Sequence, residues 1–588
     1  MVMTKKIRRR AWVVFLVWVL LLGVLTSRLF YLQILHADRY IKFAQEQSQG
    51  NLLTLPVRGK IFDRNLNPLA ESIDTKSLVM AASKFAPDSQ SLQKVSNVLG
   101  IDLAHVNPEN TRSARLTYLK RQLTPEELAG MQYLWNQQEI RTAEIFLIPD
   151  TKRFYPQQKL ASHLLGFTGL DDKGYDNHGL EGLEFYYDHY LQGHADQYSV
   201  PMDARRNSLN SWELEVKNTG SNLVLTIDKN IQYMVERELE TTFRQERARH
   251  AVVIVMNPYT GEILALANYP DFNPNSFQHY PQQYYQNLAV GWEFEPGSTF
   301  KVIQTAAAFE EGILSPHSRL DNRGHFLDGA ERSETEWKQL GYLSVEDILV
   351  QSNNTGAMMI SEHVGQERFY EYMKRFGFGE LTGVDLPGEV PGKIREPKEW
   401  SSLSLQSLSI GQEIAVTPLQ MVRIFSVIAN GGILYTPYVV REIQGMDGTP
   451  GLQVEPRKVR RVISPKTAQL LREILTKVVE RGTGKQAAVK GYKVAGKTGT
   501  AQKFNNLAGD YSSTNLVTSF IGFAPADSPQ VVIAAIVDEP ALNEWGGTVS
   551  APLFKRIAER VLPYLDIPPD NNTPELVAFK KEDGVINQ

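Results

Sequence analysis

Two residues at the start of an expected helix could form a nucleophile and its base. Ser298 follows the turn Pro296-Gly297, and Lys301 stands three residues later in an S-x-x-K motif. A serine hydroxyl is a poor nucleophile until a base takes its proton, and a lysine can be that base only as a neutral amine. Lowering a lysine pKa from about 10.4 to about 7 requires roughly 4.6 kcal/mol. Burial, the positive end of a helix dipole and a second cation would each supply part of this energy.

Two further motifs could complete such a site. Lys497 opens the run K-T-G-T in a stretch that reads as a strand, and it could be the second cation. Gly499 within this run would let a ligand approach the backbone closely. Ser352 and Asn354 form an S-x-N motif, and in an extended loop they would point the same way because side chains alternate with period 2. A hydroxyl there could relay a proton and an amide could bind a substrate amide, whereas Asn353 is expected to face away and to tolerate substitution.

No single motif is specific. Roughly two S-x-x-K matches are expected by chance in a chain of this length, and Ser91–Lys94 is such a second match. Ser208–Asn210 is likewise a spare S-x-N. A lone match indicates a surface serine and a solvated lysine. The functional interpretation depends on all three motifs occurring in order within one domain.

The surrounding elements predict a mixed α/β (α+β) domain around an antiparallel sheet that is closed by strands from both ends of the domain, with an inserted helical part. A short strand and a helix capped by Asp228 come first, followed by two strands joined by a turn at Asn257–Gly261. Two more strands flank Ala526–Pro529, and a helix is expected near Ser550–Tyr564.

Two other helices have clear boundaries in the sequence. One begins with the pair Ser464-Pro465 and stops at Gly482. The other opens with a capping box from Ser344 to Asp347 and ends near Gln351, so it would deliver the chain to S-x-N.

The N-terminus predicts a single membrane anchor. Residues 5–10 read KKIRRR, and Ala11–Ser27 carries no charge, with apolar character continuing to Leu35. As a helix the uncharged run spans about 26 Å, close to a bilayer core of roughly 30 Å. The alternative is a cleaved signal peptide, but no clear small-x-small site follows Gly23. The basic cluster would stay in the cytoplasm, which places the rest of the chain outside.

Composition excludes several other classes. The 588 residues suggest two to four domains. A net charge of −4 disfavours nucleic-acid binding. The chain has no cysteine, which excludes disulfides, thiolate nucleophiles and cysteine-ligated metals. Its 11 histidines are scattered without an H-E-x-x-H motif, so a dedicated metal site is not expected.

The combined motifs resemble those of class B penicillin-binding proteins, of the FtsI-type peptidoglycan D,D-transpeptidases. S-x-x-K, S-x-N and K-[ST]-G are the motifs of this superfamily. RGKIFDRNLNPLA (58–70), RFYPQQKLASHLLGF, GLEGLE, FGFGELTGVDLPGE and SIGQEIAVTPLQM resemble further family segments. The resemblance extends over about residues 10–565.

This resemblance implies a role for each catalytic residue. Ser298 would attack the carbonyl of the D-Ala-D-Ala bond in a peptidoglycan stem peptide, giving an acyl-enzyme. Lys301 would be the base, Ser352 would help to pass the proton to the leaving amine, and Lys497 would tune the field. An amino group of a neighbouring strand would then resolve the acyl-enzyme into a cross-link, and β-lactam antibiotics would acylate the same serine. The resemblance implies that neither a metal nor an organic cofactor is needed.

The resemblance also implies the binding residues. Asn354 would hold the stem-peptide amide, and Thr498 and Thr500 would bind the terminal carboxylate beside Gly499. The backbone N–H groups of Ser298 and Thr500 would form an oxyanion hole, in which one donor is typically worth about 3–4 kcal/mol.

Five regions are expected: a cytoplasmic tail (1–10), a transmembrane anchor (11–35), an elongated N-terminal pedestal (36–220), the penicillin-binding transpeptidase domain (221–565) and a flexible tail (566–588). The family resemblance implies a single-pass protein of the inner (cytoplasmic) membrane with its catalytic domain in the periplasm or extracytoplasmic space. It also implies the SEDS-type glycosyltransferase FtsW and other divisome proteins as partners, at the septum.

Alternatives remain open. K-T-G-T and SIGQEIAVTPLQM favour the division enzyme over an elongation-specific class B paralogue, and a sporulation-specific paralogue is also possible. A membrane-anchored serine β-lactamase shares the motifs but does not require the N-terminal module. A β-lactam sensor or scaffold would need an output inside the cell, where only about ten residues are expected.

Overall fold

The computed structural model describes residues 5–37, 39–40, 49–54, 57–81, 89–102, 116–140, 145–169, 178–193, 196–201, 219–322, 341–445, 447–505 and 510–570. The chain forms two compact units. The first comprises Met1–Val57, Asp74–Thr151 and Gly193–Thr219, and the second comprises Arg58–Ile73, Lys152–Gln192 and Gly220–Gln588.

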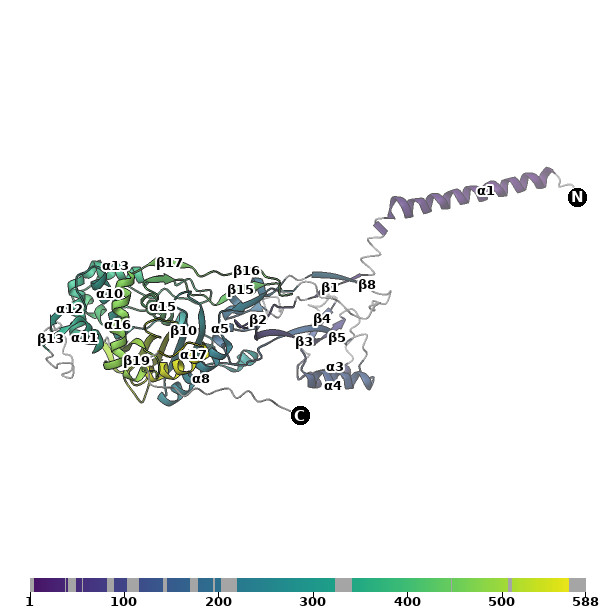
Figure 1. Cartoon of the computed structure of the whole chain (residues 1–588). Coiled ribbons are helices and arrows are strands. Elements are labelled where there is room, and N and C mark those ends of the chain that lie inside the picture. Colours follow the sequence, from purple (N-terminus) through teal and green to yellow (C-terminus); the bar gives the residue numbers. More distant parts are fainter. Residues whose placement is uncertain are drawn as a thin grey trace, which may run out of the picture. The chain divides into compact units, whose positions relative to one another are not determined.

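The second unit is built on a five-stranded antiparallel sheet in the order β11-β10-β20-β19-β18 (Figure 1). Strand β10 from the start of the domain pairs with β20 from its end, with Val253 opposite Ala535. The prediction that strands from both ends of the domain share one sheet is therefore confirmed. The strands are β10 (His250–Met256), β11 (Ile263–Tyr269), β18 (Ala495–Asn505), β19 (Asp510–Ala524) and β20 (Val531–Asp538).

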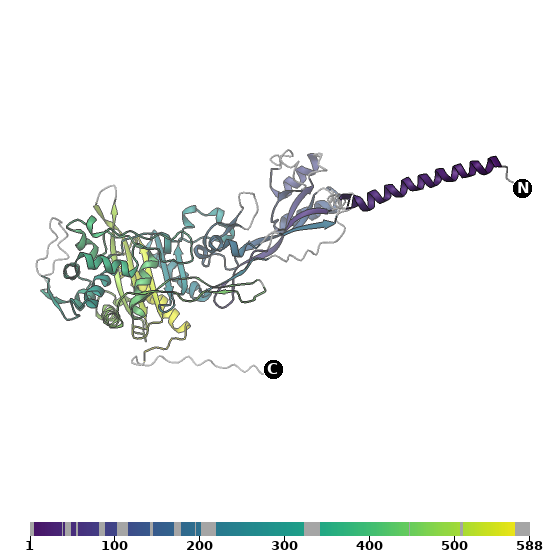
Figure 2. The same ribbon diagram turned by 90° about the horizontal axis from the view of Figure 1, so that it is seen from above.

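Both faces of this sheet are buried under helices, which is visible in the view from above (Figure 2). Because side chains alternate along a strand, Val253 and Val255 join one hydrophobic cluster and Val252 and Ile254 join the other. The first cluster contains α8 (Lys229–Glu246) and α17 (Ser550–Tyr564), and the second contains α15 (Pro418–Ala429). The result is a three-layer domain with the sheet in the middle.

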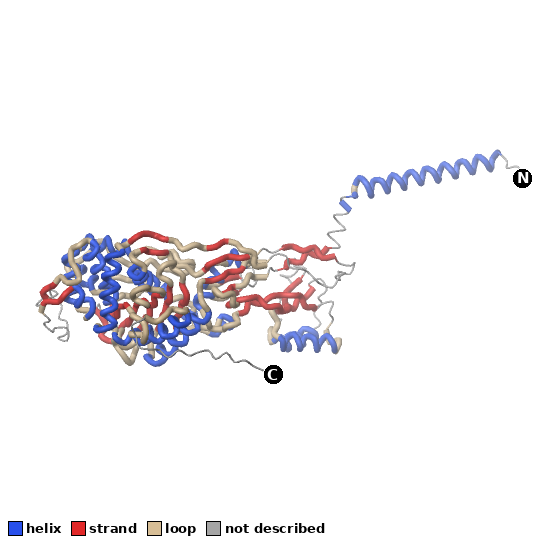
Figure 3. Tube along the Cα trace, viewed as in Figure 1, coloured by secondary structure: helices blue, strands red, loops and turns tan. Residues whose placement is uncertain are grey.

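A group of helices lies beside the sheet (Figure 3). The helix α16 (Pro465–Arg481) begins as its sequence predicts, since the Ser464 hydroxyl accepts a hydrogen bond from the N–H of Thr467. Its apolar stripe, including Leu471 and Val478, is buried. The other helices of the group are α10 (Val302–Glu310), α11 (Val345–Val350), α12 (Asn354–Val364), α13 (Gln366–Phe376) and α14 (Ser404–Ser409).

A buried ion network ties together several segments of the second unit that lie far apart in the sequence. Arg58 donates to the Glu184 and Asp188 carboxylates, at 2.6 Å each. Arg153 donates to the other oxygen of Glu184 at 2.6 Å and to the carbonyl of Gly59 at 2.8 Å. Both guanidinium charges are matched by carboxylates, so this part of the chain is held by polar contacts that are costly to break singly.

The segment that contains Arg58 forms a strand, a turn and a second strand. Strand β2 (Ile61–Phe62) pairs antiparallel with the start of β3 (Pro68–Ala81) and parallel with β9 (Asn222–Leu225). The carboxylate of Asp63 accepts hydrogen bonds from the N–H groups of Asn65 and Asn67, which closes the turn.

The first unit begins with an apolar helix. Helix α1 (Lys5–Phe30) continues into a short π-helix, Tyr31–Leu35, and together they are long and apolar enough to cross a membrane. The remaining elements of this unit include the later part of β3, which pairs with β4 at Leu78 and Lys120. They are β1 (Gln49–Thr54), α3 (Ser89–Leu99), β4 (Leu116–Lys120), α4 (Pro125–Asn136), β5 (Ile145–Phe154) and β8 (Asp196–Pro201).

The second unit also contains the start of the expected C-terminal tail and a number of short helices and strands. The start of the expected C-terminal tail packs on the domain, because Asp570 N–H donates to Gly491 O at 2.8 Å and the hydroxyl of Tyr492 donates to Ile567 O at 2.8 Å. Residues 571–588 and the spare motif Ser208–Asn210 lie outside the described residues. The short elements are α5 (Ser162–Leu165), β6 (Thr168–Gly169), β7 (His178–Gly179), α6 (Gly182–Tyr186), α7 (Asp188–Leu191), α9 (Leu288–Gly291), β12 (Arg319–Asp321), β13 (Tyr342–Ser344), β14 (Ile433–Tyr435), β15 (Val440–Gln444), β16 (Leu452–Gln453) and β17 (Lys458–Arg461).

Candidate active site

Ser298 lies in a tight turn of helix directly beneath the edge strand of the sheet. It belongs to the 3₁₀-helix Gly297–Lys301, which leads into α10. Side chains three residues apart eclipse in a 3₁₀-helix, so Ser298 and Lys301 share one side. Gly297 has a φ of 56°, and a Cβ there would lie 2.8 Å from the carbonyl oxygen of Thr500. Glycine thus allows the turn to approach β18, and it leaves Ser298 half-buried above a fully buried Lys301.

Lys301 connects the first motif with the second. Its Nζ donates to the carbonyl oxygen of Ser352 at 2.7 Å and to Oδ1 of Asn354 at 2.5 Å. Both acceptors are neutral groups, which stabilise a charged amine less than a carboxylate would.

Ser352 reaches the site through a backbone conformation that differs from the expected extended loop. Its φ is 58°, in the left-handed region, and α12 begins two residues later at Asn354. The preceding helix α11 is capped as predicted, with the Ser344 hydroxyl accepting from the N–H of Asp347. Ser352 and Asn354 meet on one side because the chain turns at Ser352, and the period-2 explanation was wrong.

The sequence predicts that Asn353 tolerates substitution, but the side chain has a structural role. Its Oδ1 accepts a hydrogen bond of 2.6 Å from the N–H of Gly356, which makes it the N-cap of α12. Replacing such a cap by alanine typically costs about 1 kcal/mol. Because Asn353 caps the helix, α12 begins directly after it and the S-x-N segment does not form an extended loop.

Lys497 completes a pair of buried lysines around Ser352. It lies on β18 with no solvent exposure, and its Nζ donates to Oγ of Ser352 at 2.7 Å and to the carbonyl oxygen of Thr498 at 3.1 Å. Burial lowers the pKa of Lys497 well below its ordinary value, and the charge of Lys301 lowers it further. The two lysines therefore bind one serine from opposite ends, Lys301 at its carbonyl and Lys497 at its hydroxyl.

The remaining K-T-G-T residues line the same edge strand. Thr498 and Thr500 share one face of β18 because they are two residues apart. The hydroxyl of Thr500 accepts from the N–H of Gly546 at 3.0 Å. A Cβ at Gly499 would lie 2.2 Å from Oγ of Ser519 and 3.0 Å from the carbonyl oxygen of Pro296, so only glycine fits between the sheet and the nucleophile turn.

Two neighbours of the site were not singled out from the sequence. The hydroxyl of Thr483, just after α16, lies 2.7 Å from the hydroxyl of Thr498. The carbonyl of Gly411 accepts from the N–H of Gly297 at 3.1 Å, and a Cβ at Gly411 would lie 2.2 Å from the Gly297 carbonyl oxygen. Gly411 lies within the family-like segment SIGQEIAVTPLQM, where no property marks it as a site residue. Thr483 follows the helix end at Gly482 and belongs to no motif. Both contacts join residues far apart in sequence, so no local pattern could reveal them.

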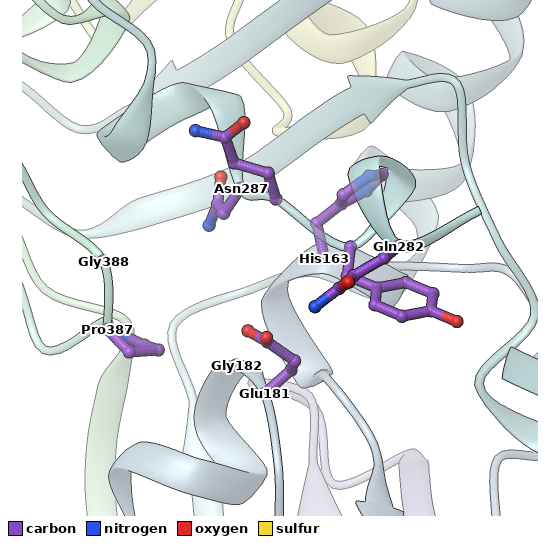
Figure 4. A pocket seen from close by; sticks show the side chains of 9 residues that line it. His163, Glu181, Gly182, Gln282, Asn287, Pro387 and Gly388 are labelled. Atoms are coloured by element: carbon purple, nitrogen blue, oxygen red, sulfur yellow. The ribbon is translucent and has the colours of Figure 1, made fainter. Parts of the chain in front are cut away.

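A separate cavity of about 230 Å³ shares no lining residue with the three motifs (Figure 4). The side chains of Glu181, Gln282 and Asn287 surround it, together with the buried ring of His163. Burial lowers the pKa of His163 to about 4, so this histidine is neutral at physiological pH. Within the described ranges, no group of three or more histidine, aspartate and glutamate side chains is placed to hold a metal ion.

The five-stranded sheet, the turn that carries Ser298 and the lysine pair are the arrangement expected of a penicillin-binding transpeptidase. Residues 251–559 match the family described as the penicillin binding protein transpeptidase domain, and residues 53–225 match the penicillin-binding protein dimerisation domain. The chain belongs to the penicillin-binding protein transpeptidase family, and within it to the class B proteins.

Curated relatives resemble the chain over nearly its whole length. It is 33% identical to the stage V sporulation protein D of Bacillus subtilis, over 97% of this chain and 88% of that protein. It is 30% identical to the peptidoglycan D,D-transpeptidase FtsI of Buchnera aphidicola, over 94% of each, and 28% identical to FtsI of Escherichia coli, over 97% of this chain and 93% of that protein.

Solved structures agree with this assignment. Penicillin-binding protein 3 of Mycobacterium tuberculosis, complexed with aztreonam, matches with a TM-score of 0.66 and 29% identity, over 88% of this chain and 98% of that one. Together these likenesses establish the class B transpeptidase fold, and the predicted mixed α/β class is confirmed.

Proposed function

We propose that this chain is a serine-type D-Ala-D-Ala transpeptidase that cross-links peptidoglycan stem peptides during septal wall synthesis. The observation that carries the proposal is the convergence of two buried lysines on Ser352, since Lys301 and Lys497 each donate to it at 2.7 Å. Two like charges so close are unfavourable in a buried site, and the pKa of Lys497 is lowered first by burial and then by the charge of Lys301. We infer that the two amines share a single positive charge, and that acylation starts from the state in which Lys497 holds this charge and Lys301 is the neutral base.

Acylation follows from this arrangement. Oγ of Ser298 attacks the carbonyl carbon of the D-Ala-D-Ala bond while Lys301 takes the hydroxyl proton. The oxygen that becomes negative is held by the N–H groups of Ser298 and Thr500. When the peptide bond breaks, the proton passes through the Ser352 hydroxyl to the leaving D-alanine amine, with Lys497 stabilising that hydroxyl as the proton moves.

Deacylation forms the cross-link. The amino group of a second stem peptide attacks the ester carbon, gives its proton to the base, and releases Ser298 with its hydroxyl restored. Asn354 holds the donor peptide amide, and Thr498 and Thr500 bind the terminal carboxylate beside Gly499. β-Lactams are recognised because they present the same carbonyl and carboxylate.

The cellular role extends the proposal. Relatives named FtsI support a septal role, whereas the 33% identical sporulation protein supports a sporulation-specific role as the second candidate. We also propose that α1 anchors the chain with residues 1–10 in the cytoplasm, that residues 36–220 form the pedestal for FtsW and divisome proteins, and that residues 221–565 are the catalytic domain. Depletion separates the roles, since loss of a division enzyme gives filaments and loss of a sporulation enzyme leaves vegetative cells normal.

Intact mass spectrometry after penicillin treatment tests the chemistry. We expect the full chain to gain one penicillin mass and Ser298→Ala to gain none. Ser91→Ala is the matched control, because Ser91 opens the other S-x-x-K match, and it should be labelled like the wild type. Labelling of Ser298→Ala would refute the nucleophile, and release of the adduct within minutes would favour a β-lactamase.

A further inference from the structure

Glu295 is a half-buried acid three residues before Ser298, and the proposed reaction does not use it. Its Oε1 accepts hydrogen bonds from the N–H of Glu413 at 2.9 Å and from the hydroxyl of Tyr511 at 3.1 Å. Its Oε2 is buried and has no hydrogen-bond partner within the described part of the chain. A charged oxygen without a donor is costly in a buried site, whereas a carboxylic acid carries a proton there. The surroundings therefore favour the protonated acid.

The contacts of Glu295 join three segments around the nucleophile turn. Phe294 forms an antiparallel bridge with Val416, and one turn later the N–H of Gly297 donates to Gly411. Glu413 lies between Gly411 and Val416 in the sequence, and its φ of 60° is in the left-handed region. Tyr511 comes from the start of β19. The carboxyl of Glu295 thus lies where the turn that carries Ser298 meets the segment 411–416 and the sheet.

Within the described ranges, no lysine or arginine forms an ion pair with Glu295. The carboxylate of Glu413 is itself bound by Arg395 and by the hydroxyl of Ser404. Glu293, on the same segment as Glu295, is paired with Lys393 at 3.0 Å. Burial raises the pKa of Tyr511, and the charge of Glu295 adds to the rise, so this tyrosine stays a neutral donor.

The protonation state of Glu295 is balanced near neutrality. Burial raises its pKa to about 7, although the hydrogen bonds from Glu413 and Tyr511 oppose the rise, and the charge of Glu413 adds to it. An acid of this kind changes its charge within the range in which bacteria grow.

We propose that Glu295 is a positioning residue for acylation, whose protonated carboxyl fixes the turn carrying Ser298 to the segment 411–416 and to β19, and whose ionisation loosens that turn. The proposal rests on the proposed role of Ser298 as nucleophile. Ionisation puts an unpaired charge on Oε2, and any movement that hydrates this oxygen displaces Pro296 and Gly297 as well. Acylation should therefore lose rate as pH rises through about 7, in addition to the pH dependence that the lysines impose.

The test compares rates of acylation by a fluorescent penicillin between about pH 5.5 and 8.5. Glu295→Gln keeps the acceptor oxygen and the shape but cannot ionise, and Glu293→Gln is the matched control on the same segment. We expect the rate of Glu295→Gln relative to wild type to rise at least about fivefold across this range, whereas the ratio for Glu293→Gln stays constant. Glu295→Ala should be slower than wild type at every pH. A constant ratio for Glu295→Gln would overturn the proposal.

Thermal unfolding supplies a readout that needs no acylation. The native carboxyl keeps its proton to higher pH than the unfolded chain does, so folding takes up a proton between about pH 4.5 and 7. The native state then loses stability as pH rises across this window, and the Tm of the wild type should fall more than that of Glu295→Gln. Equal slopes would contradict a buried acid at this position. If wild type is not acylated at any pH, the proposed function fails, and the Tm comparison still decides the state of Glu295.

Discussion

Lys497 donates a hydrogen bond of 2.7 Å to the hydroxyl of Ser352, although the two residues are 145 positions apart in the chain. Lys301 donates to the carbonyl of the same serine at the same distance. Neither lysine is exposed to solvent. The site therefore holds two amines in a volume that disfavours two charges, which is useful for a base and unfavourable for stability.

Replacing Lys497 by methionine should separate these two effects. Lys497→Met removes a buried charge and keeps a side chain of similar length. Because the hydrogen bond to Ser352 is lost, we expect penicillin acylation to fall at least about 10²-fold. The Tm should stay equal to that of wild type or rise by ~2–4 °C. Since burial and Lys301 lower the pKa of Lys497, the penalty for its charge is present at low pH and is relieved as pH rises through the native pKa. Lys497→Met should lack this pH dependence of Tm.

The control for that variant lies on the same strand. Lys503 pairs with the buried carboxylate of Asp538 at 3.0 Å, so Lys503→Met should lower the Tm and leave acylation within about threefold of wild type. A Lys497→Met chain that is unstable yet fully reactive would contradict our interpretation.

Two substitutions of Ser352 should distinguish its hydroxyl from its backbone. Ser352→Ala and Ser352→Gly both remove the group that Lys497 binds, so both should acylate about 10²-fold more slowly. Glycine adopts a φ of 58° without strain, whereas alanine does not. Urea denaturation should find Ser352→Gly more stable than Ser352→Ala by about 1 kcal/mol. Equal stabilities would mean that the left-handed turn is not retained.

Thr483 should act on the reaction through Thr498. The two hydroxyl oxygens lie 2.7 Å apart, so Thr483 restrains the side chain proposed to bind the substrate carboxylate. We expect Thr483→Val to slow penicillin acylation by about 3–10-fold, since a typical hydrogen bond contributes about 1 kcal/mol. Thr483→Ser should restore most of the rate, because it restores the hydroxyl. If valine and serine behave alike, the contact has no role in binding.

The buried network of Arg58 should be essential for stability and not for chemistry. Arg58→Met leaves Glu184 buried with only Arg153 as its cation, so unfolding should require about 3–5 kcal/mol less free energy. Lys60→Met is the control, because Lys60 forms a half-exposed pair with Glu71 at 3.3 Å, and it should change stability by less than about 1 kcal/mol. Denaturant titration measures both. A small effect of Arg58→Met would show that the network relaxes or hydrates easily.

Local interactions account for what could be predicted from the amino-acid sequence. The caps at Ser344 and Ser464, the helix that stops at Gly482 and the strand of Lys497 were all predicted correctly, because each depends on hydrogen bonds or periodicity within a few residues. The local prediction failed at Ser352, where the Asn353 cap starts a helix at once.

The amino-acid sequence was enough to predict which side chains could do chemistry and which elements carry them. The folded domain was needed to show that both lysines meet at Ser352, that the hydroxyl of Thr483 lies beside that of Thr498, and that Glu295, next to the turn carrying Ser298, accepts a hydrogen bond from Tyr511. The physical reason is that these contacts cross 15 to 216 positions of sequence, and their strength depends on burial. Burial is a property of the packed domain, so neither the distances nor the pKa shifts can be read from neighbouring residues in the chain.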